Sequence, residues 1–284
     1  MIRPFAARCK RFVKGAWKKH RLAWLRRWQG FGPEALKQTL TGLGIHTGDC
    51  LLVHSSLDRL EAFTGKSSDI LQVLQEVVGP SGLLFMPTLP FTGTAVEWAR
   101  AGSVFDLRAT PSRSGLLTEL FRRSPGVVRS IHPTHSVAAW GERADAFCRD
   151  HPNCSTPCGA GSPYAGLLAE NGKILFLGAS IESMTFFHAA EALLEEHLPF
   201  SPFTRESFRL SSRTPSGTVV TVTRLFDPEI SRKRRISRLV PDLKRRGGWR
   251  HARLGGAELL CLDARDVLAT FSEMAAQGRY GYDP

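Results

Sequence analysis

Short apolar runs alternate with helical patterns along the chain as far as residue 196. Four nearly continuous apolar runs read as buried strands, at 49–54, 83–86, 137–140 and 173–177. Between and after them, apolar residues recur at helical spacing, at 67–78, 112–123, 142–150, 162–172 and 185–196. This alternation predicts an α/β fold, a three-layer α/β/α sandwich with a mostly parallel central sheet.

A different pattern begins after Pro199. Residues 208–213 and 218–226 have strand character and flank Thr-Pro-Ser-Gly, which is typical of a β-hairpin. A further strand at 258–262 and a helix at 264–276 follow. We therefore expect a small β appendage on the sandwich.

Residues 3–29 have the pattern of one long helix with two unlike faces. Aromatic side chains, among them Trp17, Trp24 and Trp28, recur on one face, and Lys and Arg fill the others. Indole rings and basic side chains together are typical of helices that lie on anionic membranes. We divide the chain into this basic amphipathic helix, 1–32, and a main domain, 33–284. An oligomer or partner contact is the other interpretation of the helix.

The formal net charge of +12 is concentrated in two segments. Residues 1–30 contribute +10 and residues 232–250 contribute +8, which leaves −6 for the rest of the chain. A body that is mildly acidic argues against a nucleic-acid partner, although the two basic segments keep a non-catalytic nucleic-acid-binding protein as an alternative.

Cysteine usage and hydropathy bear on the compartment. Six cysteines in 284 residues do not make a disulfide scaffold, so a reducing compartment is the default. The N-terminus lacks the apolar core of a secretory signal, and no apolar run is long enough to cross a bilayer. We expect a cytoplasmic protein, with peripheral association at the inner face of the membrane as a further expectation from the basic helix. The sequence leaves the oligomeric state open.

Polar residues gather where the predicted strands end. These segments are His54-Ser55-Ser56, Pro87-Thr88, Thr110-Pro111-Ser112-Arg113, His132-Pro133-Thr134-His135, Gly159–Pro163 and Thr185–Glu191. In α/β sheets the loops at the carboxyl ends of the strands carry the ligand site. We expect the active site there.

Seven motifs along the chain together resemble one family. In order they are VHSSL, MPT, FDLRATPSRSG, HPTHSVAAWG, GAGSP, GKILFLG and TFFHAAE. Their order and spacing, from about residue 35 to about 265, resemble the aminoglycoside 3-N-acetyltransferase family. The resemblance implies that 33–284 is an acyltransferase domain. It also implies acetyl-CoA as acyl donor, no metal, and an amino group of an aminoglycoside-like acceptor as the substrate, the chemistry of antibiotic resistance.

The resemblance also implies roles for single residues. Aminolysis of a thioester needs a base for the amine, and a histidine oriented by a carboxylate supplies one. The motif positions suggest His151 as general base and Glu191 as the residue that orients it, with His132 as a rival for the base. Ser55, Ser56, Ser112 and Arg113 are the expected coenzyme residues, because backbone and hydroxyl groups suit pantetheine and arginine suits phosphate. His135 and His188 are the expected substrate residues.

Two alternatives stay open at this level. Cys148, His151, Cys154 and Cys158 lie within eleven residues of each other and suggest a zinc site, which would remove His151 from catalysis. The acceptor is also open: an amino sugar of a cell-surface glycan, carried on a nucleotide or a lipid, suits the membrane-seeking helix, whereas the acidic body suits a polycationic drug.

Overall fold

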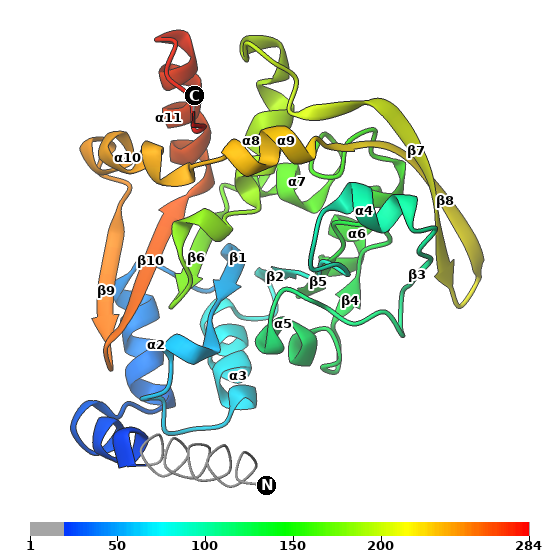
Figure 1. The fold of residues 1–284 in the computed structure, drawn as a ribbon. Helices are drawn as coiled ribbons and strands as arrows, with labels where there is room; N and C mark the ends of the chain where they lie inside the picture. The colour runs from blue at the N-terminus through cyan, green and yellow to red at the C-terminus, as the bar shows by residue number, and fades with distance from the viewer. Residues whose placement is uncertain (1–19, 284) are drawn as a thin grey trace, which may run out of the picture.

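A seven-stranded sheet forms the middle layer of the fold (Figure 1). The structure is a computed structural model that describes residues 20–283. The strand order is β4-β5-β2-β1-β6-β10-β9. In chain order the strands of this sheet are β1 (Cys50–Ser55), β2 (Leu83–Pro87), β4 (Val128–Arg129), β5 (Val137–Trp140), β6 (Lys173–Leu177), β9 (Arg250–Leu254) and β10 (Ala257–Asp263).

The sheet is mixed, which corrects the expectation of a mostly parallel one. Only β2, β1 and β6 run parallel, in two of the six pairings, and the other four pairings are antiparallel. The sequence pattern could not distinguish a parallel sheet from a mixed one, because β5 and β10 are as apolar as the parallel strands. In addition, β4 and β9 were not predicted from the sequence. The carboxyl ends of the three parallel strands still meet at one edge of the sheet.

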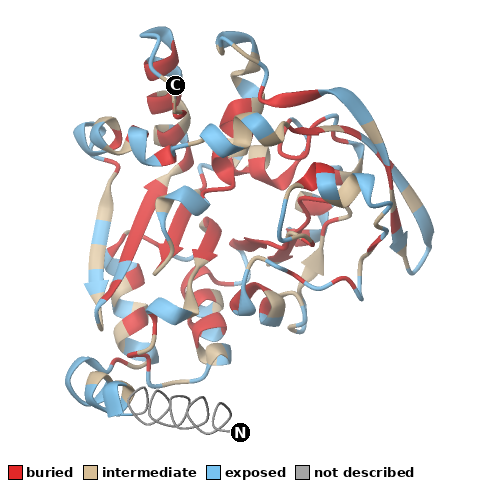
Figure 2. Cartoon of the chain, in the orientation of Figure 1, coloured by how far each residue is buried: buried red, intermediate tan, exposed pale blue. Residues whose placement is uncertain are grey.

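Both faces of the sheet are buried, which confirms the three layers (Figure 2). Alternate side chains of β1 enter opposite layers: Cys50 and Leu52 join one apolar cluster, and Leu51 and Val53 join the other. One layer contains α2 (Pro33–Gly42), α3 (Ser67–Val78) and α5 (Leu116–Phe121). The other contains α6 (Ala144–Cys148), α7 (Pro163–Ala169), α8 (Phe186–Leu193), α10 (Val240–Arg246) and α11 (Ala264–Ala276).

The helices α3 and α7 show how local sequence sets the element ends. α3 buries its apolar positions and stops at Gly79, whose φ of 68° is a left-handed conformation that favours glycine. At α7, the Ser162 hydroxyl accepts a hydrogen bond from the Ala165 N–H at 3.2 Å, and Pro163 occupies the first turn. The GAGSP motif is therefore in part a helix start.

The predicted β appendage is present. β7 (Phe203–Thr214) and β8 (Gly217–Phe226) form a hairpin whose closing pair is Thr214 and Gly217, and the short β3 (Phe105–Asp106) extends it to three strands. α4 (Ala95–Arg100) packs on the hairpin, and α9 (Pro228–Lys233) follows it. In Figure 1 the hairpin projects from the side of the sandwich.

Only part of the basic N-terminal helix falls within the described residues. Residues 20–29 are helical, whereas the predicted stretch 3–19 lies outside the described residues. Trp24 and Trp28 are 59% and 67% exposed. Phe31, by contrast, is buried against Phe63 and pairs with it in a backbone bridge, so the segment joins the main domain just before residue 32. Among residues 20–283, no helix combines the length and apolarity that crossing a bilayer requires.

Candidate active site

A pocket of about 450 Å³ lies at the carboxyl ends of the three parallel strands. We call it the strand-end pocket. Its walls come from the ends of β1 and β2, the start of α5, the segment after β6 and the start of α8. The lining residues are Val53, His54, Ser55, Ser56, Pro87, Leu89, Ser114, Thr118, Ala179, Ser180, Ser183, Thr185 and His188. Three of the six polar segments, those that begin at His54, Pro87 and Thr185, therefore meet at this edge of the sheet.

One histidine of this pocket is paired with a carboxylate. His188 and Glu191 lie one turn apart on α8, and His188 Nδ1 is 2.8 Å from Glu191 Oε2. The His188 side chain is 18% exposed, whereas that of Glu191 is fully buried. The pair therefore joins a buried carboxylate to an imidazole at the pocket wall.

Glu191 is ionised although it is buried. Burial alone raises the pKa of its carboxyl group, but the Arg234 guanidinium and hydrogen bonds from His188 and Tyr282 outweigh burial and lower it. Arg234 Nε and Nη2 donate to the two carboxylate oxygens at 2.9 and 3.1 Å, and the Tyr282 hydroxyl donates to Oε1. An ionised carboxylate accepts hydrogen bonds only.

The charge of Glu191 determines the tautomer of His188. Since the Glu191 carboxylate accepts the hydrogen bond, His188 Nδ1 carries the proton and donates the hydrogen bond. Nε2 then keeps a lone pair in the neutral ring. The pKa of His188 is lowered by burial and by the Arg234 charge, and these effects outweigh the opposite effect of Glu191. At neutral pH the ring is uncharged and able to accept a proton.

His151 does not pair with Glu191 in the described part of the chain. Its Nδ1 lies 2.7 Å from the Ser130 hydroxyl, and its Nε2 lies 2.9 Å from the Pro157 carbonyl oxygen. A carbonyl oxygen accepts only, so Nε2 carries the proton and the Ser130 hydroxyl donates to Nδ1. With no exposed surface and both ring nitrogens engaged, His151 joins two loops, and burial lowers its pKa to about 4.

The other predicted histidines lie beside these two. His132 stacks on His151 with ring centroids 4.6 Å apart, and its Nδ1 accepts from the backbone N–H of His135 at 3.1 Å. The ring of His135 meets that of His188 edge-on at 6.0 Å. Burial lowers the pKa of both His132 and His135 well below its ordinary value, so both rings are neutral. His135 thus lies beside His188, and His132 contacts both His135 and His151.

The predicted coenzyme residues divide into two groups. Ser55 and Ser56 line the strand-end pocket. Ser112 instead lies buried against Thr118, hydroxyl to hydroxyl at 2.8 Å, and holds the turn before α5. Arg113 is exposed on the same turn, and its backbone N–H donates to the Leu89 carbonyl at 2.7 Å.

The sequence assigned no individual role to four further residues at or near the pocket. His54 lines the pocket and stacks on Phe176, and burial lowers its pKa to about 3. Arg129 joins three motif loops through the Thr88 and Thr110 carbonyls, at 3.0 and 2.6 Å, and the Ser136 hydroxyl at 3.2 Å. Arg234 and Tyr282 contact Glu191 from the far end of the chain. In the sequence Arg234 looks like one more residue of a basic run, and no local signal marks Tyr282.

The cysteine cluster shows no metal-binding geometry among residues 20–283. No group of three or more His, Cys, Asp or Glu side chains there is arranged to hold a metal ion. The Sγ of Cys154 contacts the carbonyls of Asp150 and Ala160, and burial raises the pKa of the Cys148, Cys154 and Cys158 thiols. Burial thus favours the protonated thiol in all three side chains.

The fold and the strand-end pocket together define an α/β protein with a pocket at the ends of parallel strands and a histidine–carboxylate pair in the pocket wall. The chain belongs to the aminoglycoside 3-N-acetyltransferase family, whose sequence profile matches residues 52–276. A curated relative, aminoglycoside N(3)-acetyltransferase VII of Streptomyces paromomycinus, is 36% identical over 173 residues, which is 56% of this chain and 60% of the relative. The matched region thus spans about three fifths of that relative's length.

Solved structures agree over a larger part of the chain. The binary complex of AAC-IIIb with CoASH has a TM-score of 0.74 and 25% identity, and the match covers 89% of this chain and 99% of that one. The sisomicin-bound neutron and X-ray structure of AAC-VIa has a TM-score of 0.72 and 25% identity, with 87% and 99% covered. The architecture is therefore shared along nearly the whole length of both proteins.

Proposed function

We propose that this protein transfers an acetyl group from acetyl-CoA to an amino group of an aminoglycoside-like acceptor. The observation that carries the proposal is the His188–Glu191 pair at the wall of the strand-end pocket. Family membership supports the reaction type, and the relatives described above include one bound to CoASH and one bound to sisomicin.

In this reaction His188 is the general base. Its Nε2 accepts a proton from the acceptor amine as the nitrogen attacks the thioester carbonyl, and Glu191 stabilises the imidazolium that forms. The C–S bond of acetyl-CoA breaks as the amide forms, and the imidazolium returns the proton to sulfur, so that CoA leaves as the thiol. Since the buried His151 has no free ring nitrogen, we assign the base to His188, keep Glu191 as the orienting residue and place His151 and His132 in the supporting structure.

The composition of the strand-end pocket suits the acyl donor. Its polar lining consists mainly of hydroxyl groups, including Ser55, Ser56, Ser180 and Ser183, beside small apolar residues. Pantetheine is an uncharged chain of amide and hydroxyl groups, so hydroxyl partners match it. Arg113, exposed on the neighbouring turn, is our candidate for a phosphate contact.

An amino sugar carried on a nucleotide or lipid is the second candidate acceptor. The observation in its favour is that no Asp or Glu is among the residues that line the strand-end pocket, whereas a polycationic drug is best bound by carboxylates. Phosphate groups of such an acceptor suit the basic segment 232–238 better than a polycation does.

Thiol release from acetyl-CoA tests the proposal. The purified protein is mixed with acetyl-CoA and a panel of aminoglycosides, free amino sugars and nucleotide-linked amino sugars, with chelator present. We expect release only when an amine is added, and loss of release in His188→Asn. A protein that releases no thiol with any amine of the panel would refute the enzymatic proposal, and the amine that reacts best decides between the two acceptors.

A further inference from the structure

The Glu191 carboxylate is contacted by two side chains from the C-terminal part of the chain. Arg234 follows α9 and donates to both oxygens, with Nη2 also 2.8 Å from Oε1. Tyr282 lies in the tail after α11 and donates its hydroxyl to Oε1. His188 holds Oε2. Each carboxylate oxygen thus has at least two donors.

Arg234 and Tyr282 are themselves paired by the backbone. They face each other in an antiparallel bridge, flanked by hydrogen bonds from Arg235 N to Gly281 O at 2.7 Å and from Asp283 N to Lys233 O at 2.6 Å. Opposed residues of an antiparallel pair direct their side chains to the same face. This bridge therefore sends the guanidinium and the phenol together towards Glu191.

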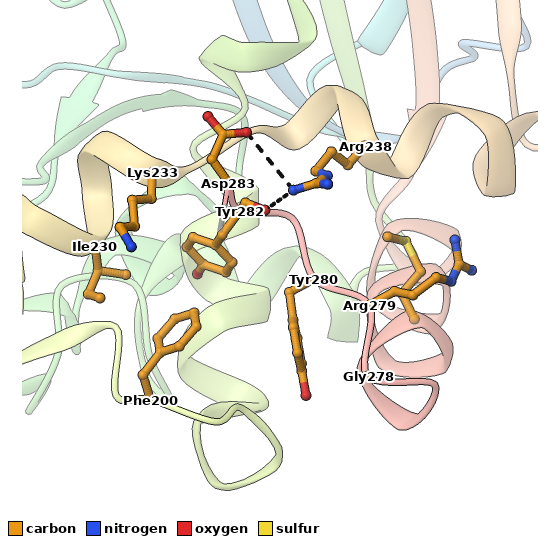
Figure 3. Close-up of a pocket in the computed structure, with 10 residues that line it drawn as sticks. Phe200, Ile230, Lys233, Arg238, Gly278, Arg279, Tyr280, Tyr282 and Asp283 are labelled. Carbon is orange, nitrogen blue, oxygen red and sulfur yellow. Dashed lines mark hydrogen bonds and ion pairs between the residues drawn. The ribbon is translucent and has the colours of Figure 1, made fainter.

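The outer side of the bridge borders a second cavity, of about 610 Å³ (Figure 3). Figure 3 shows the end of the tail beside the segment that carries Ile230, Lys233 and Arg238, with the Arg238 guanidinium bonded to the Tyr282 carbonyl oxygen and paired with Asp283. On the inner side the Tyr282 ring is only 5% exposed. The tail thus separates the buried carboxylate from solvent.

We propose that Arg234 and Tyr282 are positioning residues for the acetyl transfer, and that the C-terminal tail is therefore part of the catalytic apparatus. The inference rests on the proposed role of the His188–Glu191 pair. Arg234 keeps Glu191 ionised and fixes the orientation of its carboxylate through two hydrogen bonds, from Nε and Nη2. Tyr282 donates to Oε1, so that Oε2 remains the oxygen that His188 contacts. His188 is thereby held in the tautomer that keeps a lone pair on Nε2.

The physical reason is the cost of a buried charge. A carboxylate without exposed surface takes up a proton or turns away unless cations and donors compensate it. The other titratable groups that face the pair do not supply this charge. They are Cys158, His135 and His54, and burial keeps all three uncharged at neutral pH. The neighbouring residue of β8, Phe226, is apolar.

Removal of the Arg234 charge should change the pKa of the His188–Glu191 pair in a known direction. A positive charge disfavours a bound proton, so its loss raises the pKa of the His188–Glu191 pair. The active form has Glu191 ionised and His188 neutral, and the acidic limb of the pH–rate profile therefore moves to higher pH. We expect a shift of about one unit or more in Arg234→Gln, since a charge at this distance typically shifts a pKa by about 1–3 units.

Three variants separate the roles. Arg234→Gln removes the charge and the paired guanidinium donors. Arg234→Lys keeps the charge and loses the paired donors, and Tyr282→Phe removes one hydroxyl group. In Arg234→Gln we expect kcat to fall about tenfold or more and the acidic limb of the pH–rate profile to move to higher pH. In Arg234→Lys we expect kcat to fall while the acidic limb stays near its wild-type pH. In Tyr282→Phe we expect a smaller fall, with the limb shifted in the same direction. KM for acetyl-CoA should change little in all three.

The matched controls are Arg253→Gln and Tyr280→Phe, which make the same chemical changes at positions that do not contact Glu191. Arg253 is an exposed residue of β9 that is paired with Glu258 of β10, and Tyr280 lies in the tail. Both controls should keep the wild-type kcat and pH profile. Thermal unfolding and CoA binding confirm that each variant is folded.

A second measurement does not depend on turnover. The ¹⁵N shifts of the His188 imidazole, followed against pH without substrates, report its tautomer and pKa directly. We expect Nδ1 protonated in the wild type and a raised pKa in Arg234→Gln. An unchanged His188 titration in folded Arg234→Gln and Tyr282→Phe would overturn the positioning role. If the wild type transfers no acetyl group although the titration behaves as expected, the proposed function fails and the structural coupling stands. If Arg234→Gln does not fold, Tyr282→Phe alone decides.

Discussion

His188 and Glu191 lie one turn apart on α8, with Nδ1 of the imidazole 2.8 Å from the carboxylate, although the sequence motifs had assigned Glu191 to a different histidine. The contact arises because α8 starts at the strand-end pocket and runs away from it. His188, near the helix start, reaches the pocket wall. Glu191, one turn deeper, is enclosed between α9, the C-terminal tail and the core.

Replacement of His188 should abolish activity without unfolding the protein. Loss of a general base typically costs about 10²–10⁴-fold in rate, so we expect kcat of His188→Asn to fall by that factor while CoA still binds. The comparison is His151→Asn. That variant loses a hydrogen bond between two buried loops, and its main effect should be a lower thermal unfolding midpoint. A folded His151→Asn that is as inactive as His188→Asn would restore His151 as the base.

The buried histidines should make the fold sensitive to acid. Burial lowers the pKa of His54 to about 3 and that of His151 to about 4, and lowers that of His132 and His135 as well. In the unfolded chain these rings titrate near 6.5, so between the two pKa values the unfolded state binds more protons. Stability is therefore fully present above about pH 6.5 and is lost as pH falls, by up to about 1.4 kcal/mol per pH unit for each ring.

Urea unfolding between pH 8 and pH 4.5 measures this loss. His151→Gln, which cannot take up the proton, should show a shallower fall than the wild type below pH 6.5. A wild-type stability that is flat over this range would contradict the neutral, buried state of these rings.

Arg113→Ala should weaken acetyl-CoA binding more than it lowers kcat. The side chain is exposed beside the strand-end pocket, and its turn is held by the Arg113 N–H to Leu89 carbonyl bond. A charge-assisted contact with phosphate contributes about 1.5–3 kcal/mol, so KM for acetyl-CoA should rise about tenfold or more. Arg113→Lys keeps the charge and should recover most of the affinity. Isothermal titration with CoA gives the same comparison without turnover, and equal affinities in wild type and Arg113→Ala would remove Arg113 from the coenzyme site.

The basic N-terminal segment should bind anionic membranes. Trp24 and Trp28 are exposed, and Lys and Arg surround them in the sequence, an arrangement that suits a lipid headgroup layer. We expect sedimentation with vesicles that contain phosphatidylserine, and less sedimentation for Trp24→Ser/Trp28→Ser. Substitution is a cleaner test than truncation at residue 32, which would also remove the buried Phe31. Equal sedimentation of the wild type and the double variant, or none with either, would refute the membrane role.

Patterns close together in the sequence predicted most of the fold. The apolar runs at 49–54 and 173–177 and the helical periods at 67–78 and 264–276 became β1, β6, α3 and α11, because burial on both faces of a sheet or on one face of a helix leaves a regular spacing. The hairpin around Thr-Pro-Ser-Gly was also predicted, since its turn is local. Helices such as α5 and α8 proved shorter than predicted, because helix ends depend on contacts made by the last turn.

The sequence by itself determined the family, the layered α/β fold and the loops that form the pocket, because motif order and hydrophobic period are properties of neighbouring residues. Only the tertiary structure decided strand direction at the sheet margins and the partner of each histidine. The period of a strand is the same in either direction, so β5 and β10 gave no sign of being antiparallel. In the sequence, His151 and His188 both lie close to predicted loops, and nothing in the local pattern distinguishes their roles. What distinguishes them is that chain segments 43 and 91 residues beyond Glu191 return to hold its carboxylate, while Ser130 and the Pro157 carbonyl occupy both nitrogens of His151.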